Sequence, residues 1–447
     1  MFRDVVYRTN HSHNGKELRA KKRLWKKVMA KSSGEQICVW LDDPAYGLLQ
    51  QIGTLSRGDR GSVRFSYEPG WLKHAHAFPL DPALDLTAGE FFPGNSNFGV
   101  FMDSCPDRWG QLLMKRREAV EAKDEGRTPR TLGSWEFLLG VQDCTRMGAL
   151  RYSRPGEQHF LADEALSAPP VARIAELQAI AFELTRKKQD DLGKIKGWLK
   201  VLVAPGSSLG GARPKANLID EDGSLWIAKF PSADDDYDVA LWEKLLQELA
   251  QRCGITVPDA RLMQIGNGYH TFLVKRFDRN GDKRRFFASA MTMLGHVDTE
   301  DASYLELAEF LATYGEADSI VQDLEELFTR VAFNVATANR DDHLRNHGFI
   351  RSPAGWRLAP AFDMNPSFRK DEHVLSLDLY NRRPDMEVVL STAGFYRLAS
   401  SRAKKIIVEV CNAVGAWQPR AKKLGLSRQE CSEAGHLFCS ASTLWAQ

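Results

Sequence analysis

Apolar residues recur along the first third of the chain with the spacing of short strands. Between residues 37 and about 152, the runs ICVWL, IGTL and SVRFSYEPGWL alternate or are rich in β-forming residues, with Gly or Pro between them. A helical stretch, WGQLLMKRREAVEA, begins after Pro106 and Asp107, whose types suit a helix start. A helix near residues 134–139 and a strand ending at Tyr152 complete an α+β unit over residues 37–155. No residues in it have catalytic spacing, so we interpret its polar side chains as caps and surface, and its role as accessory.

The pattern that follows predicts a β-rich lobe and then a mostly helical one. Residues 156–170 lack periodicity, which indicates a linker. A helix over 171–187, a hairpin of residues 218–219 and 225–230, a helix over 241–251 and a strand over 271–277 form a lobe spanning 171–280. A second lobe, 281–447, is helical except for a hairpin at 348–350 and 356–358. Its segment 404–417 carries an apolar face expected in the core: Ile406, Ile407, Val410, Val414 and Trp417. The fold class is therefore α+β, in two parts.

Composition restricts the class of protein more than its chemistry. A chain of 447 residues can hold two or three domains, and 43% hydrophobic with 26% charged residues is typical of globular proteins. Sixty basic and 58 acidic residues leave a net charge of +2, which favours neither a nucleic-acid nor a membrane surface. Seven cysteines without a CxxC pair fit reduced thiols. We expect a cytoplasmic protein with no membrane segment.

Residues 1–36 differ from the rest because Lys and Arg dominate between positions 16 and 31. We interpret this stretch as a basic tail that is disordered or lies upstream of the native start, for which Met29 is a candidate. The alternative is a basic arm that contacts nucleic-acid phosphates.

The polar stretch from 339 to 363, NRDDHLRNHGFIRSPAGWRLAPAFD, carries the strongest chemical pattern. It follows an apolar helical segment over 320–335. Asp341 and Asn346 have the five-residue spacing of the catalytic aspartate and asparagine in protein kinases, and Asp363 follows beyond the hairpin. One carboxylate to accept a hydroxyl proton, with an amide and a second carboxylate to hold Mg²⁺, is the set that phosphoryl transfer from ATP needs. Taken alone, this spacing is more often found in a solvated turn.

Several upstream features suit the same chemistry. Gly210 and Gly211 lie in PGSSLGGARPKANLI, where backbone amides can approach phosphate, although a simple turn has the same residues. Lys229 lies in the second strand of the hairpin, where it reaches either phosphates or solvent. Glu243, on the next helix, is the candidate partner of that lysine. The strand that follows ends in a candidate adenine-binding hinge: Lys275, Arg276 and Phe277. The acidic run 234–236 is interpreted as a solvated turn before the helix.

Eight motifs in this order resemble one known family. They are FSYEPGWL, DSCPDRWG, SSLGGARPK, WIAKFP, ELAQRCGITVPDARL, VKRFDR, NRDDHLRNHGF and LAPAFDM, within about residues 37–425. The chain resembles the HipA family, the serine/threonine kinase toxins of type II toxin–antitoxin systems. Arg213-Pro214 departs from the Gln-Glu of the best-known members, and proline stiffens that loop.

The resemblance implies a role for each matching residue. Asp341 would be the catalytic base, and Asn346 and Asp363 the magnesium ligands. The ATP-binding residues would be Gly210, Gly211, Ala212, Arg213, Pro214, Lys215, Lys229, Lys275, Arg276, Phe277, His343 and Phe362. Ser208, with Ser207 as neighbouring candidate, would be the site of autophosphorylation, which ejects the glycine loop and inactivates the kinase.

The resemblance also implies partners. The family's usual partner is a small HipB-like helix-turn-helix antitoxin that contacts operator DNA, and some members phosphorylate glutamyl-tRNA synthetase. Two alternatives remain open from the sequence: a catalytically silent corepressor subunit, and a small-molecule kinase related to aminoglycoside phosphotransferases.

Overall fold

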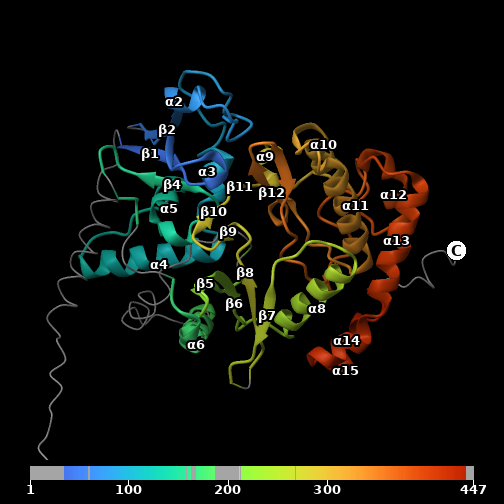
Figure 1. Cartoon of the computed structure of the whole chain (residues 1–447). Coiled ribbons are helices and arrows are strands. Elements are labelled where there is room, and N and C mark those ends of the chain that lie inside the picture. Colours follow the sequence, from blue (N-terminus) through green and yellow to red (C-terminus); the bar gives the residue numbers. More distant parts are fainter. Residues whose placement is uncertain are drawn as a thin grey trace, which may run out of the picture.

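A computed structural model describes residues 35–58, 61–157, 159–162, 168–186, 211, 213–266 and 268–438. The first part is a four-stranded antiparallel sheet in the order β3-β2-β1-β4, with helices packed against it (Figure 1). Its elements are β1 (Glu35–Leu41), η1 (Pro44–Tyr46), β2 (Gln50–Arg57), β3 (Val63–Tyr67), α2 (Pro69–Leu72), α3 (Gly99–Asp103), α4 (Arg108–Asp124), α5 (Ser134–Gly140), η2 (Asp143–Thr145) and β4 (Leu150–Ser153). The predicted strands and helices of this part are confirmed, except that residues 69–72, predicted as the end of a strand, form α2. We refer to residues 35–157 as the N-terminal domain.

A second antiparallel sheet, in the order β5-β6-β8-β7, forms the small lobe at the centre of the molecule (Figure 1). Its elements are η3 (Val171–Arg173), α6 (Ile174–Thr185), β5 (Lys215–Ile219), β6 (Leu225–Lys229), α8 (Val239–Arg252), β7 (Ala260–Met263) and β8 (Thr271–Lys275). Residues alternate between two faces along each strand. One face, with Ala216, Ala228 and Leu273, packs with α6 and also with α4 of the N-terminal domain.

The large lobe is helical apart from one three-stranded sheet, in the order β11-β12-β13. Its elements, after the short hairpin β9 (Arg279–Asn280) and β10 (Lys283–Arg284), are β11 (Phe287–Ser289), α9 (Ala290–Met293), α10 (Tyr304–Tyr314), α11 (Ile320–Ala336), η4 (Leu344–Asn346), β12 (Gly348–Ser352), β13 (Gly355–Leu358), α12 (Met386–Ser391), η5 (Ala393–Tyr396), α13 (Ser400–Gly415), α14 (Trp417–Leu424) and α15 (Arg428–Ala434). The α+β fold class is thereby confirmed. The apolar segment predicted over 404–417 is buried but divided, since α13 ends at Gly415 and α14 begins at Trp417.

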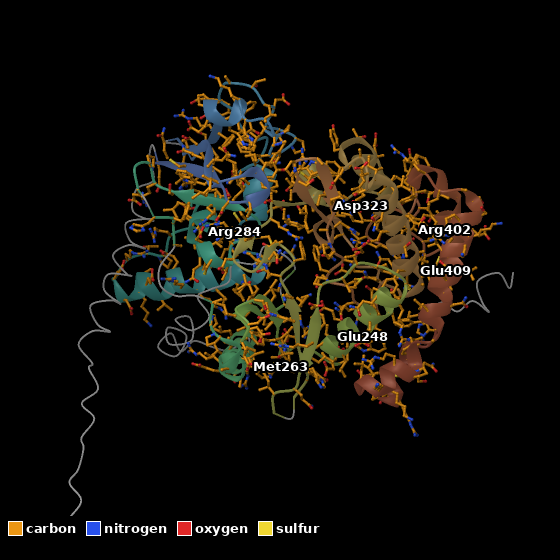
Figure 2. All side chains as sticks on the ribbon, viewed as in Figure 1. Glu248, Met263, Arg284, Asp323, Arg402 and Glu409 are labelled. Carbon is orange, nitrogen blue, oxygen red and sulfur yellow. The ribbon has the colours of Figure 1, made fainter. Side chains whose placement is uncertain are left out.

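Buried charges join the N-terminal domain to the hinge strand and the hairpin that follows it. Asp278 has no exposed side-chain surface, and its carboxylate accepts bonds from Arg276, Arg279 and the Gly148 amide. Although burial disfavours its charge, the two guanidinium groups hold the pKa of Asp278 well below its usual range. Arg284, labelled in Figure 2 beside the N-terminal domain, pairs with Asp143 at 2.9 Å. This contact surface is therefore a paired ionic cluster buried between two parts of the chain.

Part of the segment predicted as a linker is also attached to the fold. Phe160 bridges Ser153 in an antiparallel pair, and Pro170 bridges Ile219 of β5. No helix in the described residues is long and apolar enough to span a lipid bilayer.

Candidate active site

The loop between α11 and β12 is anchored by a carboxylate that sequence reasoning passed over. Asp342 is buried and accepts bonds from the Tyr304 hydroxyl at 2.7 Å and the Asn334 amide at 2.7 Å. Its third partner is His347, at 2.6 Å. Burial opposes ionisation, but His347 and these bonds hold the pKa of Asp342 below its usual value. The signal available in the sequence was the second Asp of the DD pair, directly beside the candidate base.

The side chain of Asp341, the predicted base, points toward solvent, unlike that of Asp342. Its side chain is 64% exposed and forms an ion pair with Lys370, from the segment after Asp363. Asn346 is buried, and its Nδ2 donates to the Asp341 backbone carbonyl at 3.5 Å. The anchored loop thus presents one carboxylate to solvent and turns one amide inward.

Several buried polar atoms in or near this loop lack hydrogen-bond partners within the described ranges. Among them are Asn346 Oδ1, His343 Nδ1 and Asn365 Oδ1. A buried acceptor without a partner costs about 1–3 kcal/mol, so such atoms mark a place for a ligand, ion or water. Asn365, two residues after Asp363, was not predicted as a site residue.

Lys229 stands between two carboxylates, as the strand-lysine interpretation requires. Its Nζ lies 2.5 Å from Glu243 Oε1 on α8 and 2.5 Å from Asp363 Oδ1. Burial alone would favour the neutral amine, but Asp363 and Glu243 raise the pKa of Lys229 above its usual value. For Asp363, burial is outweighed by Lys229, which lowers the pKa of that carboxyl to about 2. Burial raises the pKa of Glu243 despite Lys229. The ammonium is therefore charged, and Asp363 is ionised.

Backbone geometry places Asp363 at this point. Its φ of +60° is in the left-handed region, which is strained for most residues and tolerated by Asp. The β12–β13 hairpin that leads to it is clamped onto α11 by Asp323, which accepts from the Arg357 side chain at 2.9 Å and the Leu358 amide at 3.0 Å. Asp323 is labelled in Figure 2.

A cleft lies beside Lys229, between the small-lobe sheet and the segment that carries Asp363. The residues lining it include Ile227, Lys229, Glu243, Phe272, Val274, Lys275, Arg276, Phe277, Phe362 and Asp363. Phe277 and Phe362 stack with ring centroids 5.6 Å apart. Apolar walls beside the charged group of Lys229, Glu243 and Asp363 suit a nucleotide, whose base is flat and whose phosphates are anionic. Asp341 and Asn346 are outside this lining.

The three predicted hinge residues, Lys275, Arg276 and Phe277, differ in what their side chains contact. The Arg276 side chain is 1% exposed and binds Asp278, the Thr145 carbonyl and Asn217. Lys275 is partly exposed, 4.0 Å from Asp222, and its backbone amide donates to the Asp259 carbonyl. The guanidinium of Arg276 and the backbone amides of both residues are therefore already engaged within the protein, whereas the ring of Phe277 lies against Phe362.

The glycine loop lies mostly outside the described residues. Ser207, Ser208, Gly210 and Ala212 are not among them, whereas Gly211 and residues 213–215 are. Arg213 binds Asp235 through two nitrogens, at 3.1 and 2.7 Å. The acidic run was predicted as a solvated turn, and Asp234 and Asp236 are exposed as predicted. Asp235 is largely buried by its long-range pair with Arg213, which the local pattern does not encode, and the N-cap of α8 is Asp238.

Lys215 binds a residue of the N-terminal domain. Its Nζ is 2.5 Å from Asp107 Oδ2, and its carbonyl accepts from the Trp109 indole at 3.0 Å. Asp107 caps α4 as its position suggested, accepting from the Gly110 amide at 2.8 Å. No local pattern indicates the pairing with Lys215, which is 108 residues away.

The residue set fits magnesium held together with phosphate. In the described ranges no group of three or more His, Cys, Asp or Glu is arranged to hold a metal. Mg²⁺ commonly takes one or two carboxylates and completes its shell with phosphate and water oxygens. Asp363 Oδ and the unpartnered Asn346 Oδ1 are oxygen donors of the required type.

Comparisons with known proteins agree on one family. The HipA N-terminal domain matches residues 39–134, and the HipA-like C-terminal domain matches residues 207–418. Y4mE, a kinase-named protein of Sinorhizobium fredii (strain NBRC 101917 / NGR234), is 23% identical over 411 residues, covering 84% of each chain. A chain from the Shewanella oneidensis MR-1 complex of HipA, HipB and operator DNA is 17% identical, with a TM-score of 0.65 over 92% of this chain and 96% of that chain. The last comparison shows a shared fold.

Proposed function

The chain belongs to the HipA family, and on that premise we propose that it is an ATP- and Mg²⁺-dependent protein serine/threonine kinase. One observation carries the proposal: Lys229, in the cleft, bridges Glu243 of α8 and Asp363. Kinases use this arrangement of strand lysine, helix glutamate and metal-binding aspartate to hold ATP phosphates.

Each residue has a task in this reaction. Lys229, oriented by Glu243, binds phosphate oxygens, and the stacked rings of Phe277 and Phe362 lie against adenine. Mg²⁺, when bound by Asn346 and Asp363, neutralises charge developing on the transferred phosphoryl group. Asp341 accepts the proton of the attacking serine or threonine hydroxyl, which suits its exposure to solvent. His343 lies near the phosphates.

The biological role follows from the family. We propose that the chain is the toxin of a toxin–antitoxin pair, with a HipB-like antitoxin as partner and operator DNA contacted mainly through it. The complex of HipA, HipB and operator DNA from Shewanella oneidensis supports this assignment. The target is a translation-related protein in the cytoplasm, such as glutamyl-tRNA synthetase, and phosphorylation of Ser208 or Ser207 inactivates the kinase.

The test is phosphoproteomics after induction of three forms: wild type, Asp341→Asn and Asp318→Asn. Asp318 is an exposed aspartate in the turn before α11 and serves as the matched control. We expect wild type and Asp318→Asn to phosphorylate the same protein at Ser or Thr, and Asp341→Asn to leave it unlabelled.

Other outcomes select the alternatives. If no protein is labelled while Asp341→Asn binds the antitoxin as wild type does, the silent corepressor is correct. Turnover of a metabolite without protein labelling supports the small-molecule kinase. Self-phosphate located away from Ser207 and Ser208 refutes the proposed inactivation.

A further inference from the structure

Two lysines share one face of the small-lobe sheet. Lys215 of β5 lies directly opposite Lys229 of β6 in the antiparallel register, and cross-strand partners project to the same side. Both are buried, with 3% and 8% exposed surface. Burying a lysine is costly unless its charge is paired, and Lys229 is paired within the kinase lobes. The partner of Lys215 comes from the N-terminal domain.

The N-terminal domain holds Lys215 at both ends. Asp107 accepts from its ammonium group and Trp109 donates to its carbonyl. Asp107 is itself fixed because its other oxygen caps α4 through the Gly110 amide, and α4 packs on the small-lobe sheet through Trp109 and Leu113. The Lys215 ammonium also donates to the Gly211 carbonyl at 3.3 Å, so the contact extends into the glycine loop.

The Lys215–Asp107 ion pair also interacts electrostatically with Asp363, the proposed metal ligand. Lys215 contributes, after Lys229, to the lowered pKa of Asp363. Asp363 in turn is among the groups that raise the pKa of Asp107, although burial is the larger cause. The geometry points the same way: Lys215 contacts Asp107, and it is the cross-strand partner of Lys229, which contacts Asp363, so Lys215 lies on the face of the sheet where ATP phosphates would bind.

We propose that Asp107 is a positioning residue that holds Lys215 toward the nucleotide triphosphate, so that the N-terminal domain forms part of the nucleotide site. This rests on the proposed kinase function. A free lysine side chain has roughly 2 kcal/mol of rotamer entropy to lose when it binds a phosphate. Fixing it beforehand against Asp107 removes part of that cost. The contribution acts on phosphate and not on the base, because Lys215 is outside the apolar lining of the cleft.

The test measures binding of Mg·ATP and of adenosine to the full chain by calorimetry. Asp107→Asn keeps the size of the side chain and an oxygen to cap α4, and removes the charge that orients Lys215. We expect its Kd for Mg·ATP to rise about 10-fold, which equals about 1.4 kcal/mol, while its Kd for adenosine stays within twofold. The KM for ATP should rise more than kcat falls.

The matched control is Asp43→Asn. Asp43 is another buried carboxylate of the N-terminal domain that reaches the kinase region, accepting from the Phe286 amide at 2.8 Å. The Asp43→Asn variant should leave the dissociation constants for Mg·ATP and adenosine unchanged. The double variant Asp107→Asn with Lys215→Gln should lose no more ATP affinity than Lys215→Gln alone, because Asp107 acts through Lys215. Asp107→Glu, which keeps the charge, should retain more ATP affinity than Asp107→Asn.

Contrary results separate two failures. If wild type binds no Mg·ATP, the proposed kinase function is wrong. If wild type binds Mg·ATP and Asp107→Asn binds Mg·ATP and adenosine with the same affinities as wild type, Asp107 only joins the two domains and the inference is overturned. Should Asp107→Asn not fold, Asp107→Glu and Lys215→Gln decide: unchanged ATP affinity in both overturns the inference.

Discussion

The two sides of the candidate site are built in opposite ways. On the side of Lys229, the Lys229 and Glu243 side chains are buried and Asp363 is 28% exposed, and Lys229 Nζ lies 2.5 Å from each of the two carboxylates. On the large-lobe side, Asp341 is exposed and the buried Asn346 Oδ1 has no partner among the described residues. One side is an assembled ionic cluster and the other is an open set of donors and acceptors.

The contrast separates stability from chemistry. A buried charge that loses its partner destabilises the fold, whereas an exposed charge is screened by water and is available to a substrate. Substitutions on the small-lobe side should therefore affect both stability and ATP binding. Those at Asp341 should affect the reaction alone.

The largest effect should come from Asp341→Asn. Without a group to accept the hydroxyl proton, kcat for phosphoryl transfer should fall about 10²–10⁴-fold, because general bases contribute on that scale. The melting temperature should stay that of wild type, since the side chain is 64% exposed. Radiolabel transfer and calorimetry on the same samples check both parts. A drop in melting temperature of many degrees would contradict the view that Asp341 contributes to the reaction and not to stability.

Lys229→Met, unlike Asp341→Asn, should destabilise the fold. It leaves the buried Glu243 and the partly exposed Asp363 without their cation, at a cost of about 3–5 kcal/mol in the free energy of unfolding, measured with urea. Lys229→Met combined with Glu243→Gln should recover part of this loss, because one uncompensated charge is removed. A cost below about 1 kcal/mol for the single variant would show that solvent screens this cluster.

The pH dependence of stability sharpens the same point. The pKa of Asp363 is lowered to about 2, so its stabilising contribution is present above pH 4 and is lost as pH falls toward 2. The loss should be about 2 kcal/mol. It is obtained as the difference between urea unfolding curves of wild type and Asp363→Asn across this range. Parallel curves for the two proteins would contradict the lowered pKa.

Lys370→Ala should have the smallest effect on stability. It removes the partner of exposed Asp341, and surface ion pairs contribute about 0–1 kcal/mol. The unfolding free energy should change by less than about 1 kcal/mol, and its dependence on salt concentration should also change little. A larger loss would mean that the large-lobe side is as tightly assembled as the small-lobe side.

Local patterns were enough to predict the elements and much of the cluster, but not the contacts between distant segments. The order of strand lysine and helix glutamate, matched to the kinase pattern, singled out Lys229 and Glu243, and the structure brings their side chains together with Asp363. The burial of the Arg276 side chain depends on Asp278 and on the Thr145 carbonyl of another domain, and no local period encodes that. For the same reason Asp107 could be predicted as a helix cap and not as the partner of Lys215.

The ionic cluster around Asp278 has a consequence for how the protein unfolds. It joins Gly148 to Arg276 and Arg279, so separating the N-terminal domain from the lobes would expose a carboxylate and two guanidinium groups at once. Neither part can melt without disrupting the other, and heating should give one cooperative transition with equal calorimetric and van't Hoff enthalpies. A kinase region expressed without residues 35–157 should accordingly be insoluble, and the two matched domains behave as a single folding unit.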